Sequence, residues 1–287
     1  MKSFVLLSTQ PGFLDAKFLR QVENLAIRRV HAFTPTNCAV FLKSYALLRS
    51  PGTPKSATLV KTLQSVCKAK IDEFSAKEAL MCASALIRFD LYGMEIADSP
   101  VNSLLEHAQL EIEDGASVEA SVLAESISLQ AKWQQQSAMA FWTKQVQEHP
   151  GLKPKDVFQL AAVDELKDWL LQWILSNFDQ LLPEEICLAL KMHPGSEELR
   201  EQAYQQALSA EMSTDESLAL LVLLNKPREL SLQKLSCSQL AQYLCLPVEI
   251  ADFGLLRSQT LKVLSQRDFS VQTYTLLLRQ CFRTMSG

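Results

Sequence analysis

The side chains that could catalyse a reaction or bind a metal are widely separated in this sequence. None of the four histidines has metal-ligand spacing to another histidine, a cysteine or an acid; they are His31, His107, His149 and His193. His149 and His193 each precede a proline at the expected end of a helix, where a histidine interacts favourably with terminal carbonyl groups. Glycine-rich phosphate loops and the nucleophile-elbow pattern do not occur in the sequence. These observations predict no catalytic residue and no cofactor.

Adjacent acidic residues could form acid–base dyads, and we considered this for Glu184–Glu185 and Glu197–Glu198. Both pairs follow a residue typical of a helix start, Pro183 and Ser196 respectively. Carboxylates stabilise that end of a helix by interacting with its dipole. We therefore interpret the acidic pairs as solvated helix starts.

The cysteines form an odd and scattered set of seven: Cys38, Cys67, Cys82, Cys187, Cys237, Cys245 and Cys281. No Cys-x-x-Cys pair occurs, and each cysteine lies in an apolar helical context. We interpret them as reduced thiols that pack as small hydrophobic side chains, with neither a metal nor a disulfide framework. A reducing compartment is expected.

Helices are the elements expected to position these residues. The chain has 8 glycines, whereas average usage would give about 20, and no long stretch alternates apolar and polar residues. The longest apolar run, residues 218–224, is far shorter than the roughly 20 residues that span a bilayer. The sequence predicts an all-α protein without a membrane span.

Helix starts are marked by hydroxyl residues before proline, at Thr34, Thr53 and Ser99, and by capping-box patterns from Ser75 and Ser213. The predicted helices span residues 13–32, 36–49, 54–72, 76–91, 100–112, 117–147, 154–178, 183–192, 196–210, 214–225, 236–245, 248–265 and 270–284.

A similar sequence motif, called the phrase below, occurs three times, starting near Thr34, Phe74 and Gly115, at intervals of about 40 residues. Each phrase is a capped helix rich in Ala, Leu and Ser, and a second amphipathic helix follows the first two. Stacked helix pairs of this period predict an α-solenoid over residues 1–150, with degenerate repeats or a helical bundle over 151–287. Chance similarity among Ala/Leu-rich helices is the alternative, and HEAT- or armadillo-like packing fits the same pattern.

The segment FSAKEALMCASALIRFDLYG at 74–93 resembles the repeats of the FAST-kinase-like, heptatricopeptide and octotricopeptide families. The residues that carry the resemblance are Ser75, Glu78, Ala79, Ala85 and Leu86. It covers roughly residues 34–130. The resemblance implies an array that binds RNA in mitochondria or plastids, or that packs as a structural subunit of an organellar assembly.

Charge is distributed unevenly along the chain. Residues 1–70 hold eleven basic and two acidic residues, residues 71–252 hold twelve and twenty-nine, and residues 253–287 hold five and one. Basic ends on an acidic body favour anionic partners. The candidate contacts to RNA or an acidic partner are Lys17, Arg20, Arg28, Arg29, Lys43, Arg49, Lys55, Lys61, Lys68 and Lys70.

Together these patterns predict a non-catalytic helical-repeat scaffold, an interaction subunit of a larger multiprotein or ribonucleoprotein assembly. The expected partners are other protein subunits, with possible RNA contact at the basic N-terminal region and no small-molecule substrate. The mitochondrial matrix, or another reducing compartment, is the expected location. The alternative is an RNA-binding helical-repeat protein of organellar RNA processing or translation, and an all-α enzyme with an unrecognised site is a third class.

Overall fold

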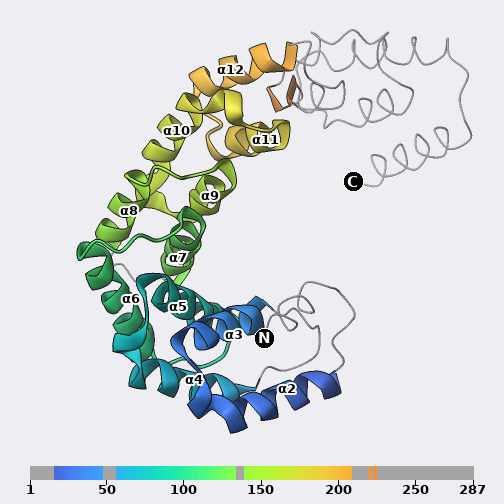
Figure 1. Ribbon diagram of the computed structural model, residues 1–287. Helices are drawn as coiled ribbons and strands as arrows, with labels where there is room; N and C mark the ends of the chain where they lie inside the picture. Colours follow the sequence, from blue (N-terminus) through green and yellow to red (C-terminus); the bar gives the residue numbers. More distant parts are fainter. Residues whose placement is uncertain (1–15, 48–55, 134–138, 209–219, 222, 225–287) are drawn as a thin grey trace, which may run out of the picture. The chain divides into compact units, whose positions relative to one another are not determined.

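The computed structural model describes residues 16–47, 56–133, 139–208, 220, 221, 223 and 224 (Figure 1). Every regular element in this part of the chain is helical, which confirms the predicted all-α class there. The chain divides into two compact units, Met1–Leu170 and Leu171–Gly287. Within the described ranges no helix is both long and apolar enough to cross a membrane.

The first unit holds most of the described helices. They are α2 (Ala16–Arg29), α3 (Pro35–Leu47), α4 (Ala57–Ala69), α5 (Ala76–Leu91), α6 (Asp98–Glu113), α7 (Ala120–Trp133), α8 (Met139–Gln147) and α9 (Pro154–Gln159). Short 3-10 helices lie between them: η1 (Val30–Ala32), η2 (Ile71–Glu73), η3 (Leu160–Ala162) and η4 (Asp164–Leu166). Helix α10 (Lys167–Ser176) crosses the boundary, and η5 (Phe178–Gln180), α11 (Pro183–Met192) and α12 (Glu197–Leu208) follow in the second unit.

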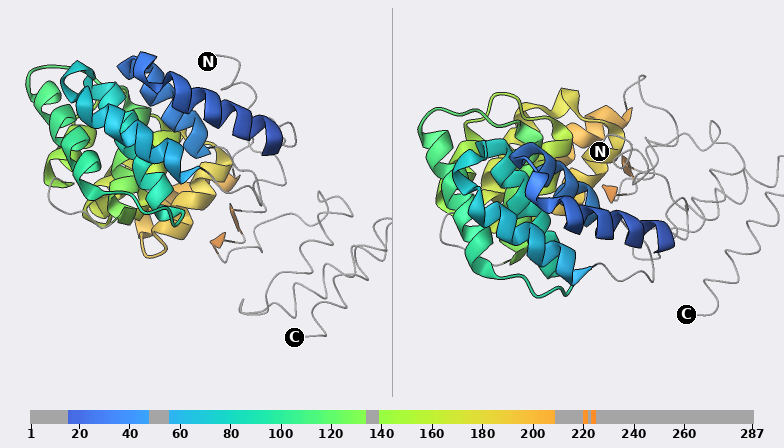
Figure 2. Two further views of the ribbon diagram at one scale, coloured as in Figure 1. Left: turned by 90° about the horizontal axis from the view of Figure 1, so that it is seen from below. Right: turned by 60° about the horizontal axis from the view of Figure 1, so that its bottom comes forward.

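Helices of the first unit pack in two adjacent rows (Figures 1 and 2). One row contains α3, α5, α7 and η3, and the other contains α2, α4 and α6. Each helix of the first row also packs against the helix that follows it in the chain. Helix α5 contacts α3, α6 and α7, so residues on most of its faces are buried, including Leu80, Leu86, Ile87 and Phe89. The core of this unit is therefore shared between successive helix pairs.

One hydrogen bond recurs within each of these helix pairs. The Lys70 side chain donates to the backbone carbonyl of Phe33 at 3.1 Å. His107 Nε2 contacts the carbonyl oxygen of Phe74 at 2.7 Å, and His149 Nε2 contacts that of Val118 at 2.9 Å. Each acceptor is a buried residue two positions before the start of a helix of the first row. Each bond therefore joins the second helix of a pair, or the turn that ends it, to the entry of the first helix.

Several predicted helix starts are confirmed. Helix α5 begins with a capping box in which Ser75 Oγ accepts from the backbone N–H of Glu78, and the Glu78 carboxylate accepts from that of Ser75. Thr34 Oγ1 accepts from the backbone N–H of Asn37 at 3.2 Å. Thr53 and Ser213 lie outside the described residues; the cap of α4 is Ser56.

The prediction that Ser99 caps a helix is wrong. Helix α6 begins at Asp98, one residue before this serine, and its N-cap residue is Ala97, which has no side-chain oxygen. Ser99 therefore lies within the first turn, followed by Pro100, a position that tolerates proline because its missing N–H has no intrahelical partner.

The predicted helix over 154–178 is also wrong, because the chain is interrupted in its middle. Leu160, Val163 and Leu166 are all fully buried, and Val163 adopts an extended conformation between two 3-10 helices. Their spacing of three residues matches the period of the 3-10 helices observed on either side of Val163. Within the predicted helix over 117–147, the structure describes α7 and α8, and residues 134–138 lie outside the described ranges.

Candidate interaction surfaces

A groove of about 590 Å³ runs over the row formed by α3, α5, α7 and η3. We call it the row groove. Its residues come from all of these elements and from α9, so the row must be assembled before the groove exists. They are Lys43, Leu47, Arg88, Ser121, Glu125, Ser128, Leu129, Lys132, Phe158, Gln159, Ala161 and Ala162.

Glu125 of α7 is the centre of the charge arrangement in the row groove. Its Oε2 atom accepts from Lys43 Nζ of α3 at 2.7 Å, and its Oε1 atom accepts from Arg88 Nη2 of α5 at 2.8 Å. Burial alone would raise the pKa of Glu125, but hydrogen bonds and charge attraction from these two cations lower it below its ordinary value. One carboxylate thus joins three successive helices of the row, and the three side chains together carry one positive charge.

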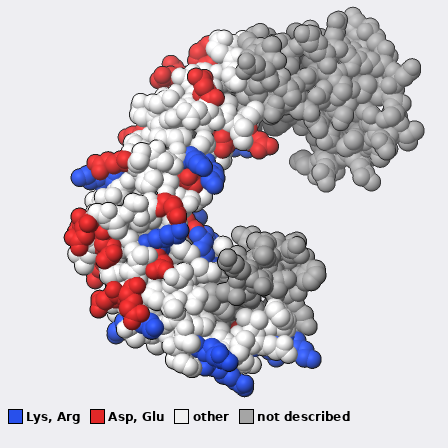
Figure 3. Space-filling view, in the orientation of Figure 1, with Lys and Arg blue, Asp and Glu red and all other residues white. Residues whose placement is uncertain are grey.

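The predicted basic contacts are divided among separate places. Arg20, Arg28 and Arg29 are exposed on α2, and the latter two end the helix. Lys43 lies in the row groove instead, and Lys70 ends α4, bonded to Phe33. Lys17 is exposed on α2, and Arg49 and Lys55 lie outside the described residues. In Figure 3 basic side chains gather at the lower end of the view, over α2 and α4.

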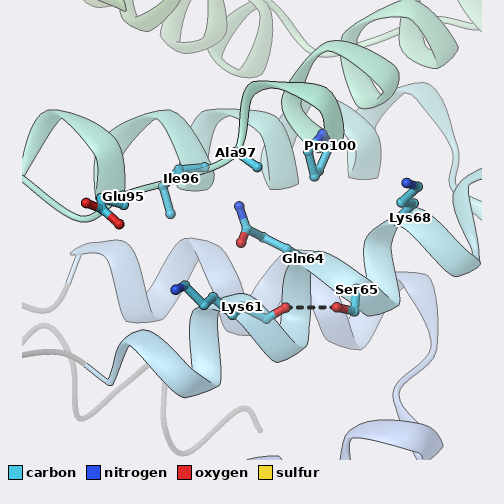
Figure 4. A pocket seen from close by; sticks show the side chains of 8 residues that line it. All are labelled: Lys61, Gln64, Ser65, Lys68, Glu95, Ile96, Ala97 and Pro100. Carbon is cyan, nitrogen blue, oxygen red and sulfur yellow. Dashed lines mark hydrogen bonds between the residues drawn. The ribbon is translucent and has the colours of Figure 1, made fainter.

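Lys61 and Lys68 are the two predicted contacts that the structure brings together. Both are exposed on α4 and line a groove of about 510 Å³, between α4 and the start of α6, which we call the α4 groove (Figure 4). The other lining residues are Gln64, Ser65, Glu95, Ile96, Ala97 and Pro100. The Glu95 carboxylate offsets part of the positive charge. The α4 groove could accept a single anionic group.

Three of the scattered cysteines meet in the core of the first unit. Cys38 of α3, Cys67 of α4 and Cys82 of α5 have their sulfur atoms within 4.8 Å of one another, and all three residues have zero solvent exposure. The Cys38 and Cys67 sulfurs are 3.5 Å apart. Their predicted burial is confirmed, whereas their convergence was not predicted. We call this group the thiol cluster.

The pKa values of the three thiols of the cluster shift in different directions. Hydrogen bonds from the Cys67 and Cys82 thiols lower the pKa of Cys38. The hydrogen bond to Cys38 raises the pKa of Cys67, and burial raises that of Cys82. Of the three thiols, Cys38 is therefore the one whose deprotonation its neighbours favour.

Sequence reasoning missed the thiol cluster and the Glu125 network for the same reason. Cys38 and Cys67 are 29 residues apart, and Lys43 and Glu125 are 82 residues apart. Neither spacing is a local motif. The recurring helix motif was the feature of the sequence that could have indicated these contacts, because helices stacked as repeats place their side chains next to one another.

Comparison of the chain with protein-family models, with curated proteins and with solved structures finds no match.

Proposed function

We propose that this protein is a non-catalytic α-solenoid that serves as an interaction subunit of a larger assembly in the mitochondrial matrix or another reducing compartment. The row groove is the partner-binding surface. It would receive a segment of another protein subunit.

The recurrence of one hydrogen bond supports a repeat architecture. Its acceptors, Phe33, Phe74 and Val118, are 41 and 44 positions apart in the sequence. These intervals are close to the period of about 40 residues read from the phrases. A repeat unit that cannot bury its apolar face alone must stack on a neighbour, which accounts for a core shared between pairs.

The composition of the row groove is the observation that carries the proposal. Both central cations, Lys43 and Arg88, pair with the Glu125 carboxylate, so this carboxylate is already engaged and does not have the open position that a general acid or base needs. Its rim is both apolar and polar, with Leu47 46% exposed and Lys132 exposed. Interfaces between proteins combine such apolar contacts with a polar rim.

Leu47 and Leu110 provide a matched pair of variants to test the row groove. Both are leucines with large exposed fractions, 46% and 60%, but Leu110 lies on α6, in the other row. We expect the wild-type chain in native extract to elute in a high-mass complex on size exclusion, with the same partners recovered by affinity capture. Leu47→Asp should shift the chain to monomer size and remove those partners, whereas Leu110→Asp should do neither.

A wild-type chain that elutes as a monomer without stable partners would contradict the proposal. Retention of the complex by Leu47→Asp would place the interface elsewhere. Circular dichroism of each variant separates loss of binding from loss of fold, and cell fractionation tests the compartment.

RNA binding is the second candidate function, and the α4 groove favours it. Lys61 and Lys68 lie on one groove, and neither forms an ion pair with another described residue. Phosphate contacts of this kind give an affinity that falls steeply as salt increases. A salt titration of RNA binding by the full chain and by Lys61→Glu/Lys68→Glu tests it. Absence of salt-sensitive binding would remove this candidate, as would an unchanged affinity in the variant.

A further inference from the structure

The thiol cluster has the composition of a soft-metal site. Cys38, Cys67 and Cys82 come from three different helices of the first unit, and their sulfur atoms already lie within 4.8 Å of one another. A metal–thiolate distance of about 2.3 Å places three trigonal sulfur ligands about 4 Å apart. The cluster is therefore close to trigonal metal geometry without movement of the helices.

The number of ligands that a metal requires distinguishes among the metals that bind thiolates. Structural zinc sites take four ligands, and catalytic zinc takes water in the fourth position. The described residues supply three metal-ligating side chains here, and all three are fully buried, so none of them contacts bulk water. Iron–sulfur clusters require four protein ligands in most cases. Cu(I) prefers soft thiolates and accepts two or three of them.

We propose that Cys38, Cys67 and Cys82 form a buried Cu(I) site that joins α3, α4 and α5. Each thiol that binds the ion releases its proton to solvent, and copper stays in the +1 state, so no electron is transferred. The site carries net negative charge, which the nearby Lys70 ammonium offsets in part. The site is independent of the proposed scaffold function and acts on the stability of the first unit.

The burial of the three sulfur atoms determines when the copper ion can bind. Because the three sulfurs have no solvent exposure, Cu(I) is bound during folding, before α3, α4 and α5 close around it. The test therefore refolds the full chain anaerobically with Cu(I) and a reductant. Its background variant replaces the other four cysteines by serine, at Cys187, Cys237, Cys245 and Cys281, so that every cysteine thiol present belongs to the cluster.

Retention of one Cu(I) per background chain against bicinchoninate, a Cu(I) chelator, is the expected result. X-ray absorption should show a shell of sulfur neighbours only, and the melting temperature should exceed that of the metal-free protein. Adding Cys67→Ser to the background should weaken retention by at least about tenfold. Cys187→Ser alone in the natural sequence should leave retention unchanged.

Three results would overturn the copper site. The first is a folded background protein, verified by circular dichroism, that retains no Cu(I). The second is undiminished retention after Cys67→Ser. The third is tighter retention of Zn(II) with a nitrogen or oxygen atom in its shell, which would show a fourth ligand and a zinc site. If Cys67→Ser does not fold, the absorption spectrum of the background protein decides alone, because a shell without sulfur excludes the cluster.

Discussion

The ring of His107 contacts the backbone carbonyl oxygen of Phe74, with Nε2 and the oxygen 2.7 Å apart. A carbonyl oxygen accepts hydrogen bonds only, so Nε2 carries the proton. The contact joins α6 to the residue before the cap of α5, and both sides of it are at least partly buried. The sequence interpretation placed His149, a second member of this series, against carbonyls at its own helix end. It contacts the carbonyl of Val118 instead, at the entry of α7, the first helix of its own pair.

Replacement of His107 by alanine should lower the free energy of unfolding by about 1 to 2 kcal/mol, because the Phe74 carbonyl loses its side-chain donor. Urea unfolding followed by circular dichroism measures the change. His31→Ala is the control, since His31 is exposed in η1, and should change stability little. Equal losses in the two variants would contradict the role assigned to the His107 contact.

Replacement of Glu125 by glutamine should destabilise the protein in a pH-dependent way. Because its pKa is lowered in the folded state, the carboxylate contributes stability that is fully present above its unfolded pKa of about 4.3 and is lost as pH falls through the folded value. We expect a loss of about 1 to 2 kcal/mol at pH 7, which shrinks below pH of about 4.

Glu119→Gln is the matched control for this pH series. Glu119 pairs with Lys77 at 2.6 Å, but the two side chains are 58% and 45% exposed, against 18% for Glu125. Solvent screening should hold its effect within about 0.5 kcal/mol at every pH. Urea unfolding of both variants between pH 3 and pH 7 would contradict the Glu125 network if the two curves coincided.

Removal of the Ser75 cap should cost about 1 kcal/mol. In Ser75→Ala the backbone N–H of Glu78 loses its acceptor, and the capping box of α5 is left with half of its bonds. Ser99→Ala is the control, because the side chain of Ser99 does not cap α6. Thermal unfolding should separate the two variants, and a loss at Ser99 as large as that at Ser75 would contradict the assigned caps.

Tyr45→Phe should destabilise the packing of α2 against its neighbours. The Tyr45 hydroxyl donates to the Glu23 carboxylate and accepts from the backbone N–H of Ser56 at 2.8 Å. Both side chains are buried, with Tyr45 at zero exposure and Glu23 at 8%. The variant leaves a buried carboxylate without its donor, which should cost about 2 to 3 kcal/mol.

A double-variant cycle tests that account of Tyr45. Tyr45→Phe/Glu23→Leu removes both polar partners and should recover part of the loss, because no buried charge is left unpaired. Urea unfolding measures the three variants. Strictly additive losses would show that the two side chains act independently.

Local signals determined the helical class and many helix boundaries. The low glycine content indicated the helical class. Capped helix starts and apolar stripes depend only on residues close in the sequence, and they predicted helices over 76–91 and 183–192, where the structure has α5 and α11. The errors occur where packing overrides that local pattern. At Val163 the backbone is extended between two 3-10 helices. Leu160, Val163 and Leu166 are all buried there, where the sequence predicted one continuous α-helix.

Only the tertiary structure decided which distant side chains meet. The sequence predicted that Lys43, Glu125, Cys38 and Cys82 lie in helices of the recurring motif, and that Cys67 lies in the amphipathic helix that follows the first of them. It did not determine that a carboxylate of α7 bonds cations of α3 and α5, or that thiols of α3, α4 and α5 converge. Helix formation depends on neighbours three and four residues away, whereas the register between stacked helices depends on how their side chains interdigitate across the shared core.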